Sequence, residues 1–463
     1  MGEIAVISFP LITEKWQEDV LFKRFEVCRS IYNSMLGKEL KKYRKMLKDE
    51  RYVNSLAVIH DAYKTEDAGE KKMKKASPEY KEATQIQKQL LKEYGFSDFS
   101  FKSEAIKESK HFKGLIPSTM ASISIGTPMW VAFDKLLFGN GEICHFKKYD
   151  SWSSIATDNR SGLRIVTKDN KTTFVMDSKE EYYVLYTSKV GKALKMKLKI
   201  DRKDLWLLEM MEKKIHIVRI TRKKVRGKYK YYVQLSVTGP SAKRYDKNGN
   251  EKHKPADNKL GIYIDTTSLT ISDKDKVETI DLNFGNSIEE EIAELSRYMD
   301  TSRRLSNPEN FNEDGTIKKG IVKNGIRMRL TWSFSKNYLK AKNKKANLQR
   351  VQAEQRKLRS NAIANMIIER GTEICINDYP FQYAAMRKKF KDGEETDAKG
   401  RNKPKSKAGK TIAENGPAYI VTALDSKLKS KGYPGVIKKE LKNIDYSKEN
   451  YRSFYANELY RMI

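Results

Sequence analysis

Two carboxylates follow predicted strands in the second half of the chain, where they could contribute to a metal site. Asp265 follows the apolar stretch LGIYI, and Asp378 follows the apolar stretch EICIN. Sites that cleave phosphodiesters hold two divalent ions about 4 Å apart between several such carboxylates. Two carboxylates are too few for a pair of ions, so we interpret Asp265 and Asp378 as caps of turns at strand ends. The alternative is a shifted register in which they share one ion.

Other metal-binding residue types are few and scattered. The three cysteines, Cys28, Cys144 and Cys375, show no CxxC spacing, which argues against a zinc ribbon and a disulfide framework within the chain. The five histidines form no HxxxH motif and no His–Cys cluster. We therefore expect no metal and no cofactor, and the cysteine usage indicates a reducing cytosol.

Basic residues greatly outnumber acidic ones. The 463-residue chain has 92 Lys plus Arg against 60 Asp plus Glu, a formal net charge of +32. Each Lys or Arg that neutralises a phosphate releases condensed counterions, so this excess favours nucleic acid as the partner. The 25 Tyr and 17 Phe are suited to stacking on unpaired bases. A merely basic protein is the alternative. No run of about 18 apolar residues predicts a membrane span, and we expect no membrane partner.

The first half predicts one strand, a block of helices and a second group of strands. Residues 3–12 predict a strand, with Pro10 as the residue that terminates it. Helical spacing follows through 13–139, with an exposed loop expected at 64–80. From 140 to 240 the pattern shifts towards period two. These strands and the first one could complete a single antiparallel barrel or sheet, with the helices as an insertion.

A polar linker at 241–258 precedes a second predicted domain at 259–463. Its strand–strand–helix–strand–helix order indicates an α/β layer fold. The most basic element is a predicted helix at 335–370, which has few acidic partners at i,i+4 spacing and therefore repels itself. Such a helix is favoured when a phosphate backbone lies beside it, although a solvated surface is the alternative.

These motifs in series resemble the TnpB family of transposon-encoded RNA-guided endonucleases, which is related to type V CRISPR effectors. The stretches that carry the resemblance are LGIYIDTTSLTISD, LSRYMDTSRRLS, SKNYLKAKNKKANLQRVQAEQRKLR, NMIIERGTEICINDYPF and KSKAGKTIAENGPAYIVTALDSKLKSKG. The resemblance covers nearly the whole chain and is weakest near 45–110. It implies an α+β multidomain fold: an antiparallel wedge β-barrel at 1–12 and 140–240, a helical recognition domain at 13–139, and a RuvC-like domain of the RNase H fold at 259–463.

The resemblance also places the family's metal ligands on residues that are not carboxylates. The first slot, an Asp in the family, is Tyr263, and the second, a Glu, is Asn377. The third Asp and the zinc ribbon before it have no counterpart. Tyr ionises near pH 10 and Asn is neutral, so we predict neither catalytic Mg²⁺, nor structural zinc, nor nuclease activity. The alternative is an active endonuclease that uses Asp265, Asp378 and Asp445.

Within the family, a degraded RuvC site and a lost ribbon are similar to the nuclease-dead repressors called TldR. That resemblance implies a guide RNA, a double-stranded DNA target with an adjacent motif, and an R-loop that blocks transcription by occupancy. It also implies a monomeric ribonucleoprotein in the bacterial cytosol or nucleoid. A general RNA-binding protein is a further alternative.

The resemblance assigns the basic surfaces to guide and target. We expect the guide–target duplex to contact Arg303, Arg304, Lys336, Lys340, Lys342, Lys344, Lys345, Arg350, Arg356, Lys357 and Arg359. We expect guide-RNA phosphates to contact a hairpin through Arg222, Lys223, Lys224 and Arg226, with Tyr229 either stacked on a base or packed in the core.

The adjacent motif must be read by side chains that reach base edges. The candidates are Tyr32, Asn33, Ser118, Thr119 and Ser122. Ser and Thr at the start of a helix are more often caps, and we favour that interpretation for the last three.

Overall fold

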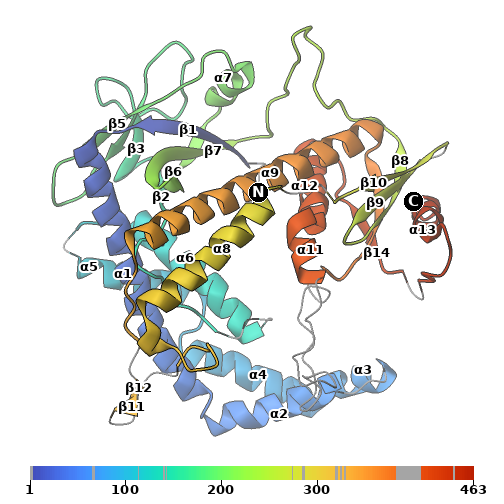
Figure 1. Ribbon diagram of the computed structural model, residues 1–463, viewed down its shortest axis with the longest axis horizontal. Coiled ribbons are helices and arrows are strands. Elements are labelled where there is room, and N and C mark those ends of the chain that lie inside the picture. The colour runs from blue at the N-terminus through green and yellow to red at the C-terminus, as the bar shows by residue number, and fades with distance from the viewer. Residues whose placement is uncertain are drawn as a thin grey trace. The chain divides into compact units, whose positions relative to one another are not determined.

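The computed structural model describes residues 4–64, 68–112, 114–138, 141, 143–273, 275–283, 287–318, 322–323, 326–327, 330–381, 408–441 and 444–463. Contacts divide the chain into two units, Met1–Lys223 with Tyr229–Gly239, and Lys224–Lys228 with Pro240–Ile463. Each unit has its own sheet and helices, so the protein is an α+β protein of more than one domain (Figure 1). Within the described ranges, no helix is both long enough and apolar enough to cross a membrane.

The sheet of the first unit has seven strands in the order β2-β6-β7-β1-β5-β4-β3, and its described pairings are antiparallel. The strands are β1 (Ile4–Ile12), β2 (Ser154–Asp158), β3 (Leu163–Val166), β4 (Tyr183–Tyr186), β5 (Leu194–Leu198), β6 (Ile215–Val225) and β7 (Lys228–Thr238). The prediction that the first strand joins the later group is confirmed, because β1 lies between β7 and β5. Alternate residues Ile7, Phe9 and Leu11 of β1 are buried and form part of the core.

The predicted range 3–12 agrees with β1, but the terminating role predicted for Pro10 is wrong, because the strand continues to Ile12. Pro10 pairs with Tyr232 of β7, and the next residue, Leu11, pairs with Leu198 of β5. The Pro10 carbonyl accepts a hydrogen bond from the Lys199 N–H at 2.8 Å. Pro10 therefore lies where the pairing of β1 passes from β7 to β5. At this position the missing N–H of proline interrupts no run of backbone hydrogen bonds between strands.

Side chains bring the two edges of this sheet together, so that it is nearly closed. The Thr157 hydroxyl, on β2, donates to the Leu163 carbonyl of β3 at 2.9 Å. The buried Asn159 amide accepts from the Ile165 N–H at 2.8 Å and donates to the Thr173 carbonyl at 2.6 Å. These contacts satisfy buried backbone groups that a continuous ladder would otherwise pair.

The helices of the first unit are α1 (Lys15–Met46), α2 (Glu50–Lys64), α3 (Ala68–Ala76), α4 (Pro78–Glu93), α5 (Asp98–Lys110), α6 (Thr119–Phe138) and α7 (Leu205–Met211). The predicted loop at 64–80 is wrong where the chain is described, because α3 and the start of α4 lie there. The run AGEKKMKKA is rich in strong helix formers despite its charge. Ser77 caps α4 by accepting the Tyr80 N–H, and Pro78 takes the first helical position.

The sheet of the second unit has five strands in the order β10-β9-β8-β13-β14. They are β8 (Lys259–Ile264), β9 (Ser268–Ser272), β10 (Val277–Asp281), β13 (Glu373–Asn377) and β14 (Ile437–Lys439), and a separate pair consists of β11 (Val322–Lys323) and β12 (Ile326–Arg327). Strands β8, β13 and β14 are parallel, whereas β9 is antiparallel to both β8 and β10. The sequence predicted β8, β9 and β13 but neither β10 nor β14.

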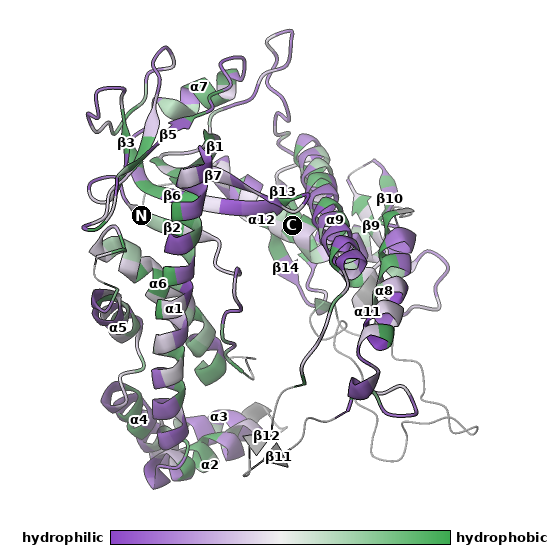
Figure 2. Ribbon diagram, turned by 60° about the vertical axis from the view of Figure 1, so that its left-hand side comes forward, coloured by the Kyte–Doolittle hydropathy of each residue, from purple (hydrophilic) through white to green (hydrophobic). Residues whose placement is uncertain are grey.

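The helices of this unit are α8 (Ser287–Ser306), a short 3-10 turn (Pro308–Asn310), α9 (Lys336–Arg370), α11 (Ala408–Asn415), α12 (Pro417–Ser430) and α13 (Tyr451–Arg461). The predicted basic helix is confirmed as α9, with Ser335 as its N-cap and Gly371 as its C-cap. Hydrophilic residues occupy much of α9 (Figure 2). The lysine-rich sequence at 387–410 also predicts a basic loop. Residues 387–407 lie outside those that the structure describes, and 408–410 begin α11.

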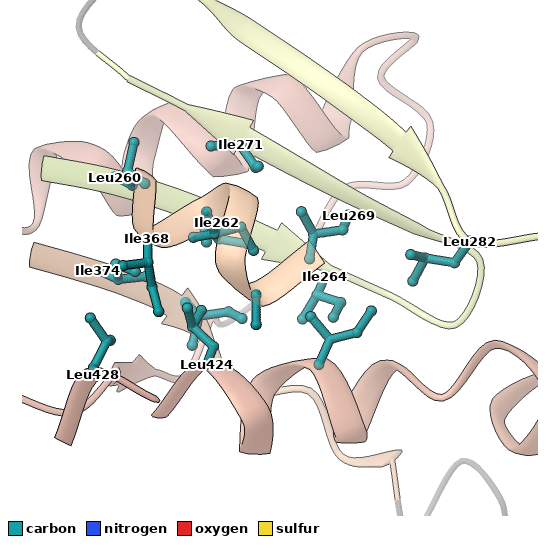
Figure 3. Close-up of a cluster of buried hydrophobic side chains, with 14 residues drawn as sticks. Leu260, Ile262, Ile264, Leu269, Ile271, Leu282, Ile368, Ile374, Leu424 and Leu428 are labelled. Atoms are coloured by element: carbon teal, nitrogen blue, oxygen red, sulfur yellow. The ribbon is translucent and has the colours of Figure 1, made fainter. Parts of the chain in front are cut away.

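Strand β8 has two buried faces because successive side chains point to opposite sides of a sheet. On one face, Leu260, Ile262 and Ile264 pack in a core cluster together with side chains of α9 and α12 (Figure 3). On the other face, Tyr263 packs in a second cluster with Tyr455, Ala456 and Leu459 of α13. The C-terminal helix, which the sequence analysis missed, therefore covers the face of β8 that carries Tyr263.

Gly261 permits the close approach of α13 to β8. A Cβ at position 261 would lie 2.1 Å from the Ala456 carbonyl oxygen and 2.2 Å from the Tyr460 backbone nitrogen. We predict that Gly261→Ala destabilises the second unit by about 1–3 kcal/mol and exposes α13 to protease, because backbone atoms must move to make room.

Limited proteolysis with identification of C-terminal fragments measures this effect. Gly37→Ala in α1 is the matched control, since nothing lies within 4 Å of a Cβ there. It should leave the cleavage rate unchanged and add up to about 1 kcal/mol of helix stability. Equal protection of α13 in both variants would contradict the prediction.

Candidate functional site

The first expected metal-ligand slot, Tyr263, is closed by aromatic packing. Its side chain is fully buried, with ring centroids 5.8 Å from Tyr451 in an edge-on arrangement and 6.0 Å from Tyr455 in a stacked one. Burial raises the pKa of the Tyr263 phenol far above its ordinary value. The hydroxyl has no hydrogen-bond partner among the described residues. A neutral phenol in an apolar cluster cannot supply the negative charge that a divalent ion requires.

The second slot, Asn377, completes the pairing of β13 with β8. Its Oδ1 accepts the Ile264 N–H at 2.7 Å, and its Nδ2 donates to the Ile264 carbonyl at 2.9 Å. The backbone ladder between these strands ends one residue earlier, at Ile376 and Ile262. A carboxylate could accept the N–H but could not donate to the carbonyl, so this buried position selects an amide.

Asp265 caps the turn between β8 and β9, as the sequence analysis predicted. Its Oδ1 accepts the N–H groups of Thr267 and Ser268, both at 2.8 Å. Its Oδ2 accepts a hydrogen bond from the Nε–H of Arg452, on α13, at 2.8 Å. Burial raises the pKa of Asp265, but these hydrogen bonds and the guanidinium charge lower it by more, so the pKa lies below its usual value. The buried carboxylate is thus ionised and already paired with a cation.

The other two carboxylates of the alternative metal set do not converge on Asp265. The Asp378 side chain is 59% exposed and lies 3.8 Å from the Lys438 ammonium. Asp445 accepts the N–H and hydroxyl of Ser447 at 3.0 and 2.6 Å. Within the part of the chain that the structure describes, no three His, Cys, Asp or Glu side chains gather closely enough to hold a metal ion.

The residues at these strand ends therefore do not fit a pair of divalent ions. They are one tyrosine, one amide whose two ends are both bonded, and one carboxylate paired with Arg452. An ion beside Asp265 would meet the charge of the guanidinium, and two ions would repel each other without carboxylates between them.

Arg222 is placed differently from the prediction. Its side chain is 2% exposed and lies 3.2 Å from the Asp150 carboxylate and 3.9 Å from Glu26. Its Nε donates to the Trp152 carbonyl at 2.9 Å, and its guanidinium lies 4.7 Å from the ring centroid of Phe25. The assignment of Arg222 to guide-RNA phosphates is corrected to a role in the core, because a buried guanidinium cannot reach phosphate.

Tyr229 is half-buried and packs against aromatic side chains, which favours the packing alternative that the sequence analysis left open. Its ring lies 6.3 Å from Phe22 and 6.4 Å from the buried Tyr231, and burial raises the pKa of its phenol. The other predicted basic residues of this hairpin are exposed; they are Lys223, Lys224 and Arg226. The turn that displays them is tight, with positive φ at Arg226 and Gly227.

The nine basic residues of α9 that the sequence analysis assigned to the guide–target duplex differ in environment. Lys344 pairs with Glu291 of α8 at 2.6 Å, and Arg350 pairs with Glu354 at 2.6 Å. Arg356 donates to the Ala413 carbonyl. Lys345 and Arg359 are half-buried, and Lys357 is exposed. Three lysines near the N-terminus of α9 are exposed and pair with no described carboxylate; they are Lys336, Lys340 and Lys342.

Arg303 and Arg304 lie at the C-terminal end of α8 and share one carboxylate. Asp300 accepts from Arg303 at 2.6 Å and from Arg304 at 3.0 Å. The Arg303 guanidinium also lies 5.4 Å from the Trp332 ring centroid. The pair retains a net positive charge and is held in place by these contacts.

The candidates for reading the adjacent motif form contacts within the first unit, except Thr119, which is exposed. Burial raises the pKa of Tyr32 to about 12, and its ring packs 5.6 Å from Trp152. The Asn33 amide bonds both the N–H and the carbonyl of Lys147, at 2.8 and 2.9 Å. Ser118 caps α6, and the buried Ser122 donates to its carbonyl. The capping interpretation of Ser118 is confirmed, and we withdraw the base-reading role of Tyr32, Asn33 and Ser122.

Sequence reasoning missed the residues of α13 that close the site. Tyr451, Tyr455 and Leu459 recur at a spacing of four, which is the signal of a helix with one apolar face. That spacing could have predicted the helix. It could not have predicted that Arg452 pairs with Asp265, 187 positions earlier in the chain.

Comparison with known proteins gives structural neighbours only. No family model and no curated protein matches the chain. A Cas12f1–sgRNA–target DNA complex gives a TM-score of 0.41 at 9% identity over 99% of this chain and 94% of that chain. A CRISPR-Cas12f ternary complex gives 0.23 at 11% identity over 99% and 93%. A Cas12i1 R-loop complex gives 0.27 at 8% identity over 92% and 56%. Similarities below a TM-score of 0.5 establish neither the fold nor the function of this chain.

We predict that the pair formed by Asp265 and Arg452 anchors α13 in a pH-dependent way. Asp265→Asn keeps the size of the side chain but loses the charge, so local opening of α13 should be easier by about 1–2 kcal/mol near neutral pH. The folded pKa of Asp265 lies below its unfolded value of about 3.9. The stabilisation is therefore present above that value and is lost as pH falls through the folded pKa.

Hydrogen exchange of the α13 amides measures this effect at neutral and at acidic pH. Asp378→Asn removes an exposed carboxylate from the end of the neighbouring strand and is the matched control, with an expected change below about 0.5 kcal/mol. Identical α13 exchange in wild type and Asp265→Asn at neutral pH would contradict the prediction.

Proposed function

We propose that the protein is a TnpB-like RNA-guided DNA-binding protein without nuclease activity, which represses transcription by remaining bound in an R-loop. The observation that carries the loss of cleavage is the ion pair of Asp265 with Arg452, 2.8 Å apart, beside buried Tyr263. The guide RNA and the target DNA come from the sequence resemblance. On the same grounds we propose that the protein is similar to the TldR group of that family.

The topology of the second unit supports the proposal. Its five strands lie in the order third, second, first, fourth, fifth along the chain, and β9 alone runs against the others. This arrangement agrees with the RNase H fold that the resemblance implies for a RuvC-like domain. Tyr263 and Asn377 lie at adjacent ends of the parallel strands β8 and β13, the position at which such domains carry ligands.

The charge distribution supports nucleic-acid binding without chemistry. The chain keeps a net charge of +32, and the lysines near the start of α9 are exposed. Exchange of a DNA duplex for an RNA–DNA duplex is nearly balanced in free energy, so contacts to the backbones can tip it. Those contacts require positive surfaces and no carboxylate.

An active endonuclease is the second candidate, with Asp265, Asp378 and Asp445 as its carboxylates. The exposed position of Asp378 and the turn-capping role of Asp445 give it little geometric support. A general RNA-binding protein is the third candidate, and the identity of the bound RNA separates it from the proposal.

Sequencing of the RNA that co-purifies with the protein tests the guided function. A guide must contain a segment that matches a DNA locus elsewhere in the genome, and a general RNA-binding partner need not. The loaded particle is then incubated with matching DNA and Mg²⁺ or Mn²⁺. We expect retention of the DNA without nicking. Specific nicking that is lost on Asp265→Ala would refute the absence of nuclease activity.

We further predict that Lys336, Lys340 and Lys342 contact phosphates. Their combined replacement by Ala should weaken nucleic-acid binding. It should also make the negative slope of log affinity against log salt less steep, by about 0.9 per lysine, because fewer counterions are released. Fluorescence anisotropy across a salt series measures this slope.

The matched control replaces three exposed lysines of α4, namely Lys81, Lys88 and Lys92. It removes the same charge and should change the slope less. Equal slopes for the two triple variants would contradict the prediction that Lys336, Lys340 and Lys342 contact phosphates.

A further inference from the structure

Two aromatic rings near the start of α9 form a stacked pair that is partly exposed. The ring of Phe334 lies 4.5 Å from that of Tyr338, with an interplanar angle of 17°. Phe334 is 41% exposed and Tyr338 is half-buried. Large apolar rings are usually buried, so a stacked pair that keeps contact with water suits a ligand with a flat face. We name Phe334 and Tyr338 the aromatic platform.

Buried amides hold the segment before the platform in place. The Asn307 side chain donates to the Ser333 carbonyl at 2.8 Å and accepts the Ser333 N–H at 2.6 Å. Asn310 donates to the Thr331 carbonyl at 2.6 Å. Both asparagines are less than 5% exposed. Ser335 then caps α9 by accepting the Tyr338 N–H at 3.0 Å. These bonds fix the backbone on both sides of Phe334, which lowers the entropy lost when a ligand binds.

The surroundings of the platform are basic. Lys336 lies between its two residues in the sequence, and Lys340 and Lys342 follow within the next turn of α9. All three lysines are exposed and pair with no carboxylate in the described ranges. Apolar rings flanked by unpaired cations complement a ligand that combines flat rings with negative charge.

We propose that the aromatic platform stacks on an unpaired nucleobase of a strand whose phosphates contact the neighbouring lysines. This inference rests on the proposed nucleic-acid-binding function and adds the place and the chemistry of one contact. An apolar peptide would also cover the rings but would leave the lysines without counter-charge. Every base has a flat face, so the contact tolerates any sequence.

The experiment measures binding of the full chain, purified free of nucleic acid, to two fluorescent oligonucleotides of equal length and charge. One is oligodeoxythymidine, and the other is an abasic strand. Phe334→Ala should weaken binding of oligodeoxythymidine about tenfold and leave abasic binding within about twofold. Phe334→Trp keeps a flat ring and should restore the preference for bases, with fluorescence of the new indole quenched by the stacked base.

Phe99→Ala is the matched control, because Phe99 is 80% exposed on α5. It should change neither affinity. Equal loss for both oligonucleotides in Phe334→Ala, or no loss for either, overturns the platform while the nucleic-acid-binding function stands. Failure of the wild-type chain to bind either strand overturns both.

Discussion

The second unit depends on how one buried negative charge is balanced at the end of β8. Asp265 is buried and ionised, and a buried ion must be paired and hydrogen-bonded to be tolerated. In a phosphodiester-cleaving site of the RuvC type, metal ions balance a group of carboxylates at this edge of the sheet. Here one guanidinium from α13 balances one carboxylate. Arg452 therefore supplies the positive charge, while Tyr263 and Asn377 are neutral and add no further negative charge at this end of the sheet.

The arrangement also explains why neutral residues fit positions 263 and 377, where the resemblance leads us to expect metal ligands. Removal of metal would leave paired carboxylates repelling each other, whereas an amide at 377 bonds both backbone groups of Ile264. Tyr263 fills the face of β8 that α13 covers, and Gly261 lets that helix approach. This end of β8 is thus packed against α13, and the surfaces that we propose to be functional are basic and aromatic.

The sequence predicted the elements whose burial pattern is local. Leu260, Ile262 and Ile264 alternate on β8, and α9 shows its cap, its basic face and its terminal glycine in one continuous stretch. Strand β14 is exposed throughout, so it lacks the alternation that marks a strand. Two predictions that rested on charge are wrong. The lysine-rich run of α3 was predicted as a loop, and Arg222 was predicted as an exposed cation. The partners that bury Arg222, Glu26 and Asp150, are remote in sequence, and no local pattern reveals them.

Titration of the full chain with Mn²⁺, followed by electron paramagnetic resonance of the free ion, tests most directly whether Arg452 stands in place of a metal ion beside Asp265. We predict no tightly held Mn²⁺ whose binding depends on Asp265, because the guanidinium of Arg452 already balances the charge of that carboxylate. Two tightly bound ions per chain, both lost on Asp265→Asn, would contradict this prediction.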